Sequence, residues 1–452
     1  MADRMPGFGR LRMGGAWALL AATLALAGCG TSAPSYGTYG AAPSVLRPQP
    51  YPSNPTNGGS PIQFQPNGLP QAAQASGFAP AGQRVALLAP LSGPNAERGQ
   101  ALAQAAKLAL DLPGAPPLDV FDTLGTPDGA AGAAQAAISG GAGLILGPLT
   151  SAETAAAAGP ANAAGVGMLA FTSDPNQSRP GIWVLGLTPA QQVRRLVTAT
   201  MAQGKTRFAA LLPPSDYGRA MSDALSRTLA SAGGASADIR TADAGMQADN
   251  VAVRDLSGYA SRRGPLDSQI RAARAKQTPE GRKEAAELVK KPIPPPPFDA
   301  LLLAATGDEL SQIASLLPYY DIDQPAVRVL GPALWANPAA LGGAKLYGAW
   351  YAAPDPAARS LFAQQYAAKY GSPAPGLADL AYDAAAIARV VSAGGGFSAA
   401  SLTRPEGFAG VDGVLGLQPD GSVRRGLAVF ELQRGGPVIV EPSPDSLGAP
   451  GT

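Results

Sequence analysis

The chain has 452 residues, 46% of them hydrophobic and 15% charged, with 34 basic and 32 acidic side chains. This composition allows a packed core and gives no overall field that would attract nucleic acid. The sequence holds no histidine and one cysteine, which excludes an internal disulfide, zinc sites of histidine and cysteine, and Ser-His-Asp or Cys-His catalysis. Carboxylate, lysine and tyrosine chemistry remains open, but the commonest general base is missing. We therefore expect no enzyme, no catalytic residues, no metal and no cofactor.

The cysteine, Cys29, ends a short apolar stretch near the N-terminus. Three arginines precede an uncharged run over residues 14–27. A positive start, about 7–15 apolar residues and small residues at the exit are the pattern of a secretory signal. The run is shorter than the roughly 20 apolar residues that span a bilayer. We therefore predict a signal peptide over residues 1–28.

The end of this stretch, Leu-Ala-Gly-Cys, resembles the lipobox of bacterial lipoproteins. In that family the cysteine receives diacylglycerol, the chain is cut before it, and its new amino group is acylated. The resemblance implies an exported lipoprotein that is anchored to a membrane at Cys29. Gly30 follows the cysteine, and in Gram-negative lipoproteins a residue other than aspartate there implies sorting to the outer membrane, facing the periplasm.

The next segment is rich in Pro, Gly, Ser, Asn, Gln and Ala. Residues 30–83 contain ten prolines, and Arg47 is their only charge. Such a segment cannot bury enough apolar surface to offset its ordering entropy. We predict a lipid-anchored disordered tether over residues 29–83, which sets how far the folded part travels from the membrane. A disordered tail is predicted over residues 443–452.

From Arg84 onward, short apolar runs alternate with longer helical patterns. The first set has strands at 84–88, 118–121, 144–146 and 167–171, and helices at 96–110, 130–138 and 152–163. The alternation restarts after Leu185, with strands at 207–212, 237–241, 300–304 and 327–330, and helices at 189–202, 217–232 and 308–317. Continuous apolar strands joined by helices predict parallel sheets that are covered on both faces.

Two such sets over about 360 residues exceed one ordinary domain. We therefore predict an α/β fold with two doubly wound lobes and a central cleft over residues 84–442. The expected first lobe comprises about 84–188 and 345–405, and the expected second lobe about 189–344 and 406–442.

One stretch interrupts the alternation. Residues 261–297 carry nine Lys or Arg and four Asp or Glu, and they end in four consecutive prolines. We predict a helical portion over about 267–290 with a stiff exit. The stretch is either a solvated insertion of the second lobe or a basic contact for an anionic partner, such as peptidoglycan or an acidic protein face.

Hydroxyl side chains follow several of the first-lobe strands. In open α/β sheets ligands bind beyond the C-terminal ends of the strands, and five residues fall there: Ser92, Thr150, Ser151, Thr172 and Ser173. Hydroxyls and free N–H groups at helix starts suit a carboxylate or another anion. The alternative is that they cap their own helices, which at Thr150 and Ser151 has at least as good a claim. Tyr217 of the second lobe either walls the cleft or packs at the hinge.

Five segments resemble type I periplasmic-binding proteins, the fold of branched-chain amino acid receptors. They are residues 88–94, 147–151, 170–173, 216–219 and 380–384, in the order of that family. In those receptors, the segment that resembles residues 331–335 carries an acidic residue for the ligand's ammonium group. Here Ala333 stands at that position, with Asp308 or Glu309 as candidates to replace it. Because an unpaired buried charge is expensive, the sequence argues against binding of free amino acids.

A narrower resemblance adds the lipobox and the tether to this fold. The combination resembles the penicillin-binding protein activator lipoproteins, and further details carry it at residues 298–302, 317–323, 347–351, 408–413 and 419–427. In that family a lipid-anchored binding-protein fold stimulates a peptidoglycan synthase. Its best-studied members have a helical repeat domain before this fold, where this chain has only the predicted tether.

Three interpretations follow. The leading one is a cell-envelope lipoprotein that activates peptidoglycan synthesis, with a penicillin-binding protein or peptidoglycan as partner. The second is a substrate-binding lipoprotein that delivers an amino acid or another small polar ligand to an ABC-type importer. The third is an enzyme that uses carboxylates on glycans, which needs two carboxyls at a defined separation; no spacing in the sequence suggests such a pair.

Overall fold

The computed structural model describes residues 82–447, except Ala235 and Ala244. The predicted signal peptide, Cys29 and all but the last two residues of the predicted tether lie outside the described residues, as does half of the predicted tail. No helix within the described ranges is long and apolar enough to cross a bilayer.

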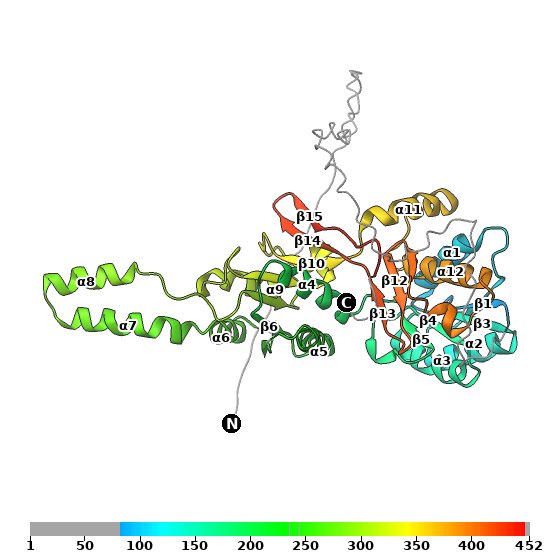
Figure 1. The fold of residues 1–452 in the computed structure, drawn as a ribbon, viewed down its shortest axis with the longest axis horizontal. Helices are drawn as coiled ribbons and strands as arrows, with labels where there is room; N and C mark the ends of the chain where they lie inside the picture. Colours follow the sequence, from blue (N-terminus) through cyan, green and yellow to red (C-terminus); the bar gives the residue numbers. More distant parts are fainter. Residues whose placement is uncertain (1–81, 235, 244, 448–452) are drawn as a thin grey trace, which may run out of the picture. The chain divides into compact units, whose positions relative to one another are not determined.

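The first lobe is built on a five-stranded parallel sheet with the order β2-β1-β3-β4-β5 (Figure 1). Its strands are β1 (Arg84–Ala89), β2 (Leu118–Asp122), β3 (Ala142–Leu146), β4 (Gly167–Ala170) and β5 (Ile182–Val184). Nearly all residues of β1, and all residues of β3, β4 and β5, are buried, as expected of parallel strands with both faces covered. The four strands predicted for this lobe are confirmed.

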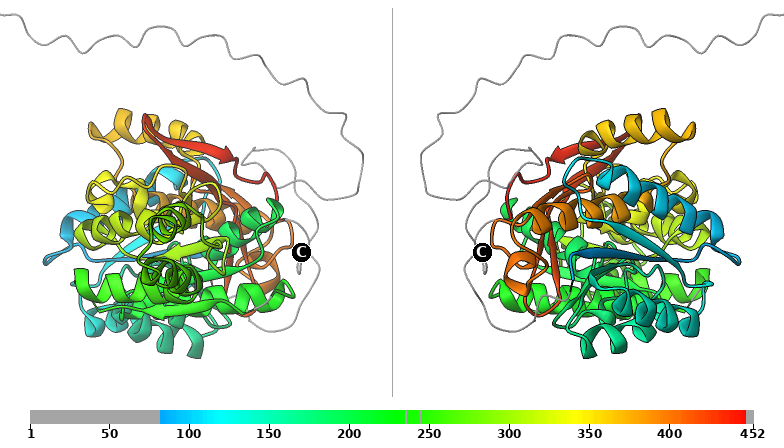
Figure 2. Two further views of the ribbon diagram at one scale, coloured as in Figure 1. Left: turned by 90° about the vertical axis from the view of Figure 1, so that its left-hand side faces the viewer. Right: turned by 90° about the vertical axis from the view of Figure 1, so that its right-hand side faces the viewer.

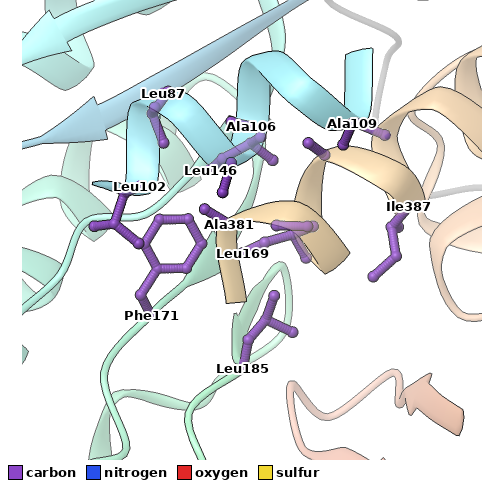
Figure 3. Packing of buried hydrophobic residues seen from close by; sticks show 14 of the residues in the cluster. Leu87, Leu102, Ala106, Ala109, Leu146, Leu169, Phe171, Leu185, Ala381 and Ile387 are labelled. Carbon is purple, nitrogen blue, oxygen red and sulfur yellow. The ribbon is translucent and has the colours of Figure 1, made fainter. Parts of the chain in front are cut away.

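Helices cover both faces of this sheet, because successive side chains of a strand point to opposite sides. Leu87 packs with α1 (Ala96–Leu110) and α12 (Ala378–Ala393), where Leu102 and Ala381 lie near Phe171 (Figure 3). Leu88 faces the other way and packs with α2 (Pro127–Ser139) and α3 (Ser151–Ala163). Helix α11 (Pro356–Tyr370) adds Phe362 and Tyr366 to the core on the α1 side.

The second lobe is built on a seven-stranded sheet with the order β15-β14-β10-β9-β8-β6-β7. Its parallel strands are β6 (Phe208–Leu212), β7 (Asp238–Thr241), β8 (Ala300–Leu303), β9 (Arg328–Gly331) and β10 (Trp350–Ala353). At one edge, β14 (Ala428–Gln433) pairs antiparallel with β10, and β15 (Gly436–Glu441) pairs antiparallel with β14. The strands predicted at 207–212, 237–241, 300–304 and 327–330 are confirmed.

The second sheet is also covered on both sides. Helices α4 (Pro189–Ala202) and α5 (Asp216–Ser231) pack on one face, and α6 (Met246–Leu256) and α9 (Gly307–Leu316) on the other. The green and yellow elements of this lobe are seen from a second side in Figure 2. Short helices complete the two lobes: η1 (Pro175–Gln177), η2 (Pro318–Tyr320), η3 (Ala333–Ala336), α10 (Pro338–Leu341) and α13 (Ala399–Leu402).

The structure differs from the expected lobe boundaries in two places. Strand β10, which we expected within the first lobe (345–405), pairs with β9 and β14 of the second sheet. The small antiparallel sheet of β11 (Phe408–Gly410), β12 (Gly413–Leu417) and β13 (Val423–Arg425), which we expected in the second lobe (406–442), packs into the first-lobe core through Phe408, Leu415 and Val423. An apolar run predicts a strand, but the partner strand that decides its lobe is distant in sequence.

The basic stretch also differs from expectation. Instead of one helical portion over 267–290, it forms α7 (Tyr259–Ala275) and α8 (Pro279–Val289). Gln277 between them has a φ of 53°, and the Thr278 side chain accepts a hydrogen bond from Gly281 N–H at the start of α8. A threonine before a proline is a helix-start signal, so the break was readable from the sequence.

The chain crosses between the lobes at residues 185–188, 354–355 and 426–427. Buried polar side chains hold the first and last of these crossings together. The Arg425 Nη2 donates to the Leu185 carbonyl at 2.7 Å, and the Gln191 Nε2 donates to the Val423 carbonyl at 2.7 Å. The first and last crossings therefore share one hydrogen-bonded support.

Beside this support lies a buried cluster of three carboxyl groups. Asp383 of α12 accepts the Val411 N–H at 2.7 Å, Asp379 pairs with Arg359 at 2.5 Å, and Asp412 lies 3.5 Å from Arg425. Burial, and then the charge of Asp412, raises the pKa of Asp383 to about 8. Burial also raises the pKa of Asp379 to about 7, although its hydrogen bond to Arg359 opposes the rise. The cluster therefore keeps a proton near neutral pH.

This cluster predicts an unusual dependence of stability on pH. An aspartate in the unfolded chain has a pKa of about 3.9, so between that value and about 8 the folded protein binds more protons than the unfolded chain. The free energy of unfolding should therefore fall as pH rises from 5 to 8, on the order of 1 kcal/mol per pH unit for each extra proton. Urea unfolding at several pH values measures this, and Asp383→Asn should flatten the slope.

Asp223→Asn, which removes an exposed carboxylate of α5, is the matched control and should keep the wild-type slope. A wild-type stability that increases from pH 5 to 8, or a slope that Asp383→Asn leaves intact, would contradict the prediction.

Candidate functional site

The candidate hydroxyl residues of the first lobe lie where β1, β3 and β4 end. A glycine is required at the end of β3: Gly147 has a φ of 86°, and a Cβ there would lie 2.3 Å from the Leu88 carbonyl oxygen of β1. This close approach positions the following loop, and with it Thr150 and Ser151, at the C-terminal edge of the sheet.

Thr150 caps helix α3. Its side chain accepts from the Glu153 N–H at 3.3 Å, while its own N–H donates to Glu153 Oε2 at 3.0 Å, which completes a capping box. Its hydroxyl lies 2.7 Å from the same oxygen. The second Glu153 oxygen accepts from the Thr123 hydroxyl at 2.5 Å, and Glu153 is fully buried. Thr150 is therefore engaged by its own helix, as the capping alternative proposes.

Ser151 and Thr172 meet at Asp174. The Ser151 hydroxyl donates to Asp174 Oδ2 at 2.5 Å, and the Asp174 N–H donates to the Thr172 hydroxyl at 3.1 Å. Gln177 Nε2 donates to Ser151 Oγ at 3.2 Å and to Asp174 Oδ2 at 3.3 Å. The structure thus brings two of the predicted residues to Asp174, with Ser151 at its carboxylate and Thr172 at its backbone N–H.

Ser92 is in a similar situation at the end of β1. Asp122, the last residue of β2, accepts hydrogen bonds from Ser92 and from the N–H groups of Leu91 at 2.9 Å and Leu124 at 2.8 Å. Thr123, the next residue, continues to Glu153. Hydroxyls from the first-lobe loops therefore join three carboxylates, those of Asp122, Glu153 and Asp174.

Asp122 and Asp174 hold their negative charge firmly. Burial acts to raise the pKa of Asp122, but the hydrogen bonds from Leu124 and Ser92 outweigh it, and the pKa lies below its ordinary value. The pKa of Asp174 is likewise lowered, because the hydrogen bonds from Ser151 and the Asn176 N–H outweigh its burial. A ligand carboxylate placed at these hydroxyls would meet like charge.

The remaining two predicted residues do not join this network. The Ser173 side chain is exposed and has no hydrogen-bond partner among the described residues. Tyr217 of α5 is half-buried against the second-lobe core. Burial raises its pKa to about 12, opposed by a hydrogen bond with Gln192. The Gln192 side chain also accepts the Ala333 N–H at 2.7 Å. Ala333 stands where the receptors carry an acidic residue, so this chain has no carboxylate at that position, and the partner of the Ala333 backbone is the neutral side chain of Gln192.

The second lobe does bury two carboxyl groups near the ends of β7 and β8. Asp249 is fully buried, and neither of its oxygens has a hydrogen-bond partner among the described residues. Burial raises its pKa. Burial, and then Asp249, raises the pKa of the half-buried Glu309, whereas Asp308 is exposed. Burial thus makes the charged form of both carboxyl groups more costly, which weakens Glu309 as a partner for an ammonium group.

Sequence reasoning missed the carboxylates and found the hydroxyls. Thr-Ser-Ala-Glu at 150–153 is a capping-box pattern, and Asp174 before Pro175 is typical of a helix start, so both could have been read as caps. The partnership of Ser151 with Asp174 joins two different loops and leaves no local signal. Within residues 82–447, no group of three carboxylate, cysteine or histidine side chains could hold a metal ion.

Comparison with known proteins gives one family and several similar structures. A family model described as periplasmic binding protein matches residues 82–437. A putative branched-chain amino acid ABC transporter protein from Rhodospirillum rubrum is 20% identical, with a TM-score of 0.60; the match covers 79% of this chain and 99% of that one. The comparison with curated protein sequences gave no match.

LpoA from Haemophilus influenzae is also similar. For the full-length protein the identity is 18% and the TM-score 0.58, and the match covers 83% of this chain but 60% of LpoA. For the LpoA C-domain, described as a regulator of PBP1A, the identity is 18%, the TM-score 0.55 and the coverage 79% of this chain and 99% of that domain. At these identities the likeness is in the fold. The predicted type I periplasmic-binding fold, and the resemblance to both groups, are confirmed.

The capping role of Thr150 predicts a cost in stability. Thr150→Ala removes the acceptor for the Glu153 N–H and should lower the free energy of unfolding by about 1 kcal/mol. Thr150→Ser keeps the hydroxyl and should lose much less. Urea unfolding of the two variants measures the difference; an alanine variant as stable as the serine variant would show that the cap is unimportant.

Proposed function

This chain belongs to the periplasmic binding protein family, and we propose that it is a cell-envelope lipoprotein that activates peptidoglycan synthesis by contact with a penicillin-binding protein. One observation carries the proposal. The polar ends of the first-lobe strands, where the receptors of this fold bind ligands, are occupied by the chain's own carboxylates.

The argument from this observation is electrostatic. Asp174 lies between Ser151 and Thr172, and Asp122 lies at Ser92, each with a lowered pKa. An amino acid would bring a carboxylate to these groups, and its ammonium would find the Ala333 backbone in the second lobe in place of an acidic side chain. The carboxylate and the ammonium group of an amino acid would therefore both lack an oppositely charged partner, and burying an unpaired charge in a closed site costs free energy. A role that needs no amino acid ligand fits these side chains better.

The comparisons support a regulatory role of this kind. The LpoA C-domain, over 99% of its length, shares the fold with this chain and is described as a regulator of PBP1A. The predicted lipid anchor at Cys29 and the predicted tether over residues 29–83 would place the folded part in the periplasm, within reach of a membrane-bound synthase. The predicted tether would set that reach.

The alternative is a substrate-binding lipoprotein of an ABC-type importer. The similarity to the Rhodospirillum rubrum protein supports this alternative, because the match covers 99% of that chain. Under this alternative the ligand would be a small polar solute other than a free amino acid, for example one with hydroxyl groups that donate to Asp122 and Asp174. The two functions make opposite predictions in the same pair of assays.

The first assay measures synthase activity. Purified mature protein should increase the rate of glycan polymerisation or cross-linking by a bifunctional penicillin-binding protein of the same organism, with saturation at an excess of the lipoprotein. A periplasmic amino acid receptor at the same concentration is the matched control. An unchanged synthase rate at every concentration, with no co-purification of the two proteins, would rule the activator role out.

The second assay is calorimetry against leucine, isoleucine, valine, glutamate, hydroxylated solutes and muropeptides. We expect no heat of binding with the amino acids. Micromolar binding of a solute, together with an unchanged synthase rate in the first assay, would support the receptor alternative instead.

The anchor is tested in cells. Cys29→Ser removes the acceptor of the lipid, and residues 1–28 are exchanged for a signal peptide that is cut without lipidation, so the protein should move from the membrane fraction to the soluble periplasmic fraction. The activator role in cells should weaken, while stimulation of the purified synthase should be unchanged because the folded part is the same. Membrane association that survives the substitution would overturn the anchor.

A further inference from the structure

A further connection joins the two lobes near the C-terminus. Strand β15 pairs with β14 in the second sheet, and the residues that follow it pack on β12 and β13. The sheet of β12 and β13 packs into the first-lobe core, and Figure 1 shows this sheet on the first lobe and β14 and β15 on the second. We call residues 442–447 the strap, because they lead from the second lobe back to the first beside the crossing at 426–427.

The strap fits closely on two glycines. At Gly416 of β12 a Cβ would lie 2.7 Å from Leu447 Cδ1, and at Gly426 it would lie 3.1 Å from Pro444 Cγ. Non-bonded carbon atoms prefer a separation of about 3.5–4.0 Å, so a Cβ at either position would displace Leu447 or Pro444. Arg424 of β13 also donates a hydrogen bond to the Leu447 carbonyl. The strap is therefore both packed and hydrogen-bonded on the first lobe.

Arg195 of α4 holds the other end of the strap on the second lobe. Its Nε donates to the Leu427 carbonyl at 2.8 Å, and its Nη2 donates to the Pro442 carbonyl at 3.1 Å. Its Nη1 lies 3.0 Å from the carboxylate of Glu441, the last residue of β15. Leu427 belongs to the crossing at 426–427 and is buried in the second-lobe core. One guanidinium group thus binds the strap to this crossing, and both of them to the second lobe.

The sequence of the strap makes its backbone stiff. Its first three residues are Pro442, Ser443 and Pro444. A proline ring fixes φ at about −65°, and a residue that precedes a proline is restricted to extended conformations. The crossing beside the strap contains Gly426, and glycine has the greatest backbone freedom of all residues. A rotation of the lobes about 426–427 therefore has to bend a stiff segment or break its contacts.

We propose that the strap holds the two lobes in one relative orientation, and that the lobes move only when it is released. Periplasmic binding proteins close around their ligands by hinge motion at a few connecting residues. In this chain one such connection, at 426–427, is bound through Arg195 to a stiffer one. The restraint gives a partner protein a constant surface to bind, but it stands apart from the activator role because it acts without a partner.

The alternative is that the strap only covers the small sheet and stabilises the first lobe. The contacts of Pro444 and Leu447 would be enough for that role. The strap is also bound to α4 of the second lobe through Arg195, and a cover for the first lobe does not need this bond. The contacts on both lobes therefore favour a restraint. The two roles differ in one measurable quantity, which is the spread of distances between the lobes.

Distances between spin labels on the two lobes test the restraint. Cys29 is the only cysteine of the chain, so in the purified Cys29→Ser protein two new cysteines carry the labels. Ala136→Cys places one label on the exposed side of α2, and Ser226→Cys places the other on the exposed side of α5. Double electron–electron resonance should give one narrow distance distribution, which becomes about twice as wide when the chain ends at Pro442. A chain that ends at Leu447 keeps the strap and should retain the narrow distribution.

The width of this distribution decides the role of the strap. A chain that ends at Pro442 and keeps the wild-type distribution would overturn the proposal, and so would an intact chain whose distribution is already as wide. A second pair of labels lies within the second lobe, at Ser226 and at the exposed Ala339 of α10, and its distribution should not change. Equal widening at this pair would assign the effect to the lobe itself and would also overturn the proposal.

Two full-length variants test the stiffness and the attachment of the strap without shortening the chain. Pro442→Gly with Pro444→Gly keeps the length of the strap but frees its backbone. Arg195→Met removes the donors to Leu427 and Pro442, and Arg98→Met, at an exposed arginine of α1, is its matched control. The first two variants should widen the distribution between the lobes, and the control should not. A loss of stability in urea with an unchanged distribution would assign the strap to stability alone and overturn the proposal.

Discussion

The structure depends on the burial of both faces of two mainly parallel sheets. Leu87 and Leu88 are neighbours in β1, and they pack into different cores on opposite faces of the first sheet. Helices must then return over both faces, and each helix that follows a strand begins at the same edge of its sheet with free N–H groups. At this edge the chain must supply acceptors for its own backbone before any ligand is bound. Thr150, Asp174 and Asp122 are such acceptors.

The same edge is where receptors of this fold bind ligands, so capping and ligand binding compete for the same atoms. In this chain capping and hydrogen bonds between the loops have taken four of the five candidate hydroxyls. Asp174 both caps η1 and holds Ser151, and Glu153 both completes the capping box and holds Thr123. The carboxylates at this edge therefore hold the loops together. They place negative charge where an amino acid receptor needs hydrogen-bond donors for the ligand's carboxylate. This is why we look for function on the outer surface of the lobes.

The sequence predicted the features that depend on neighbouring residues and missed those that depend on residues far apart in the chain. Strands such as β3 and β8 are continuous apolar runs, and helices such as α4 begin at a threonine before a proline, so local pattern was enough for them. The lobe of β10 depended on its pairing with β9 and β14, and Ser151 met Asp174 from another loop. Such partners are fixed by tertiary structure, and no local spacing encodes them.

The net charge of the whole chain does not reveal how the charged side chains are distributed in the fold. Without the predicted signal peptide the chain has 31 bases and 31 acids, a balance that predicts no general field for nucleic acid. The fold separates these charges, with the excess of bases on the hairpin of α7 and α8 and the excess of acids on the lobes. Because the Debye length is roughly 8 Å at physiological ionic strength, an ion near this hairpin senses its local positive charge and not the neutral total. Arg262 holds the hairpin to the second lobe through the carbonyl groups of Pro294 and Tyr320, so this charge lies on a fixed projection of the lobe.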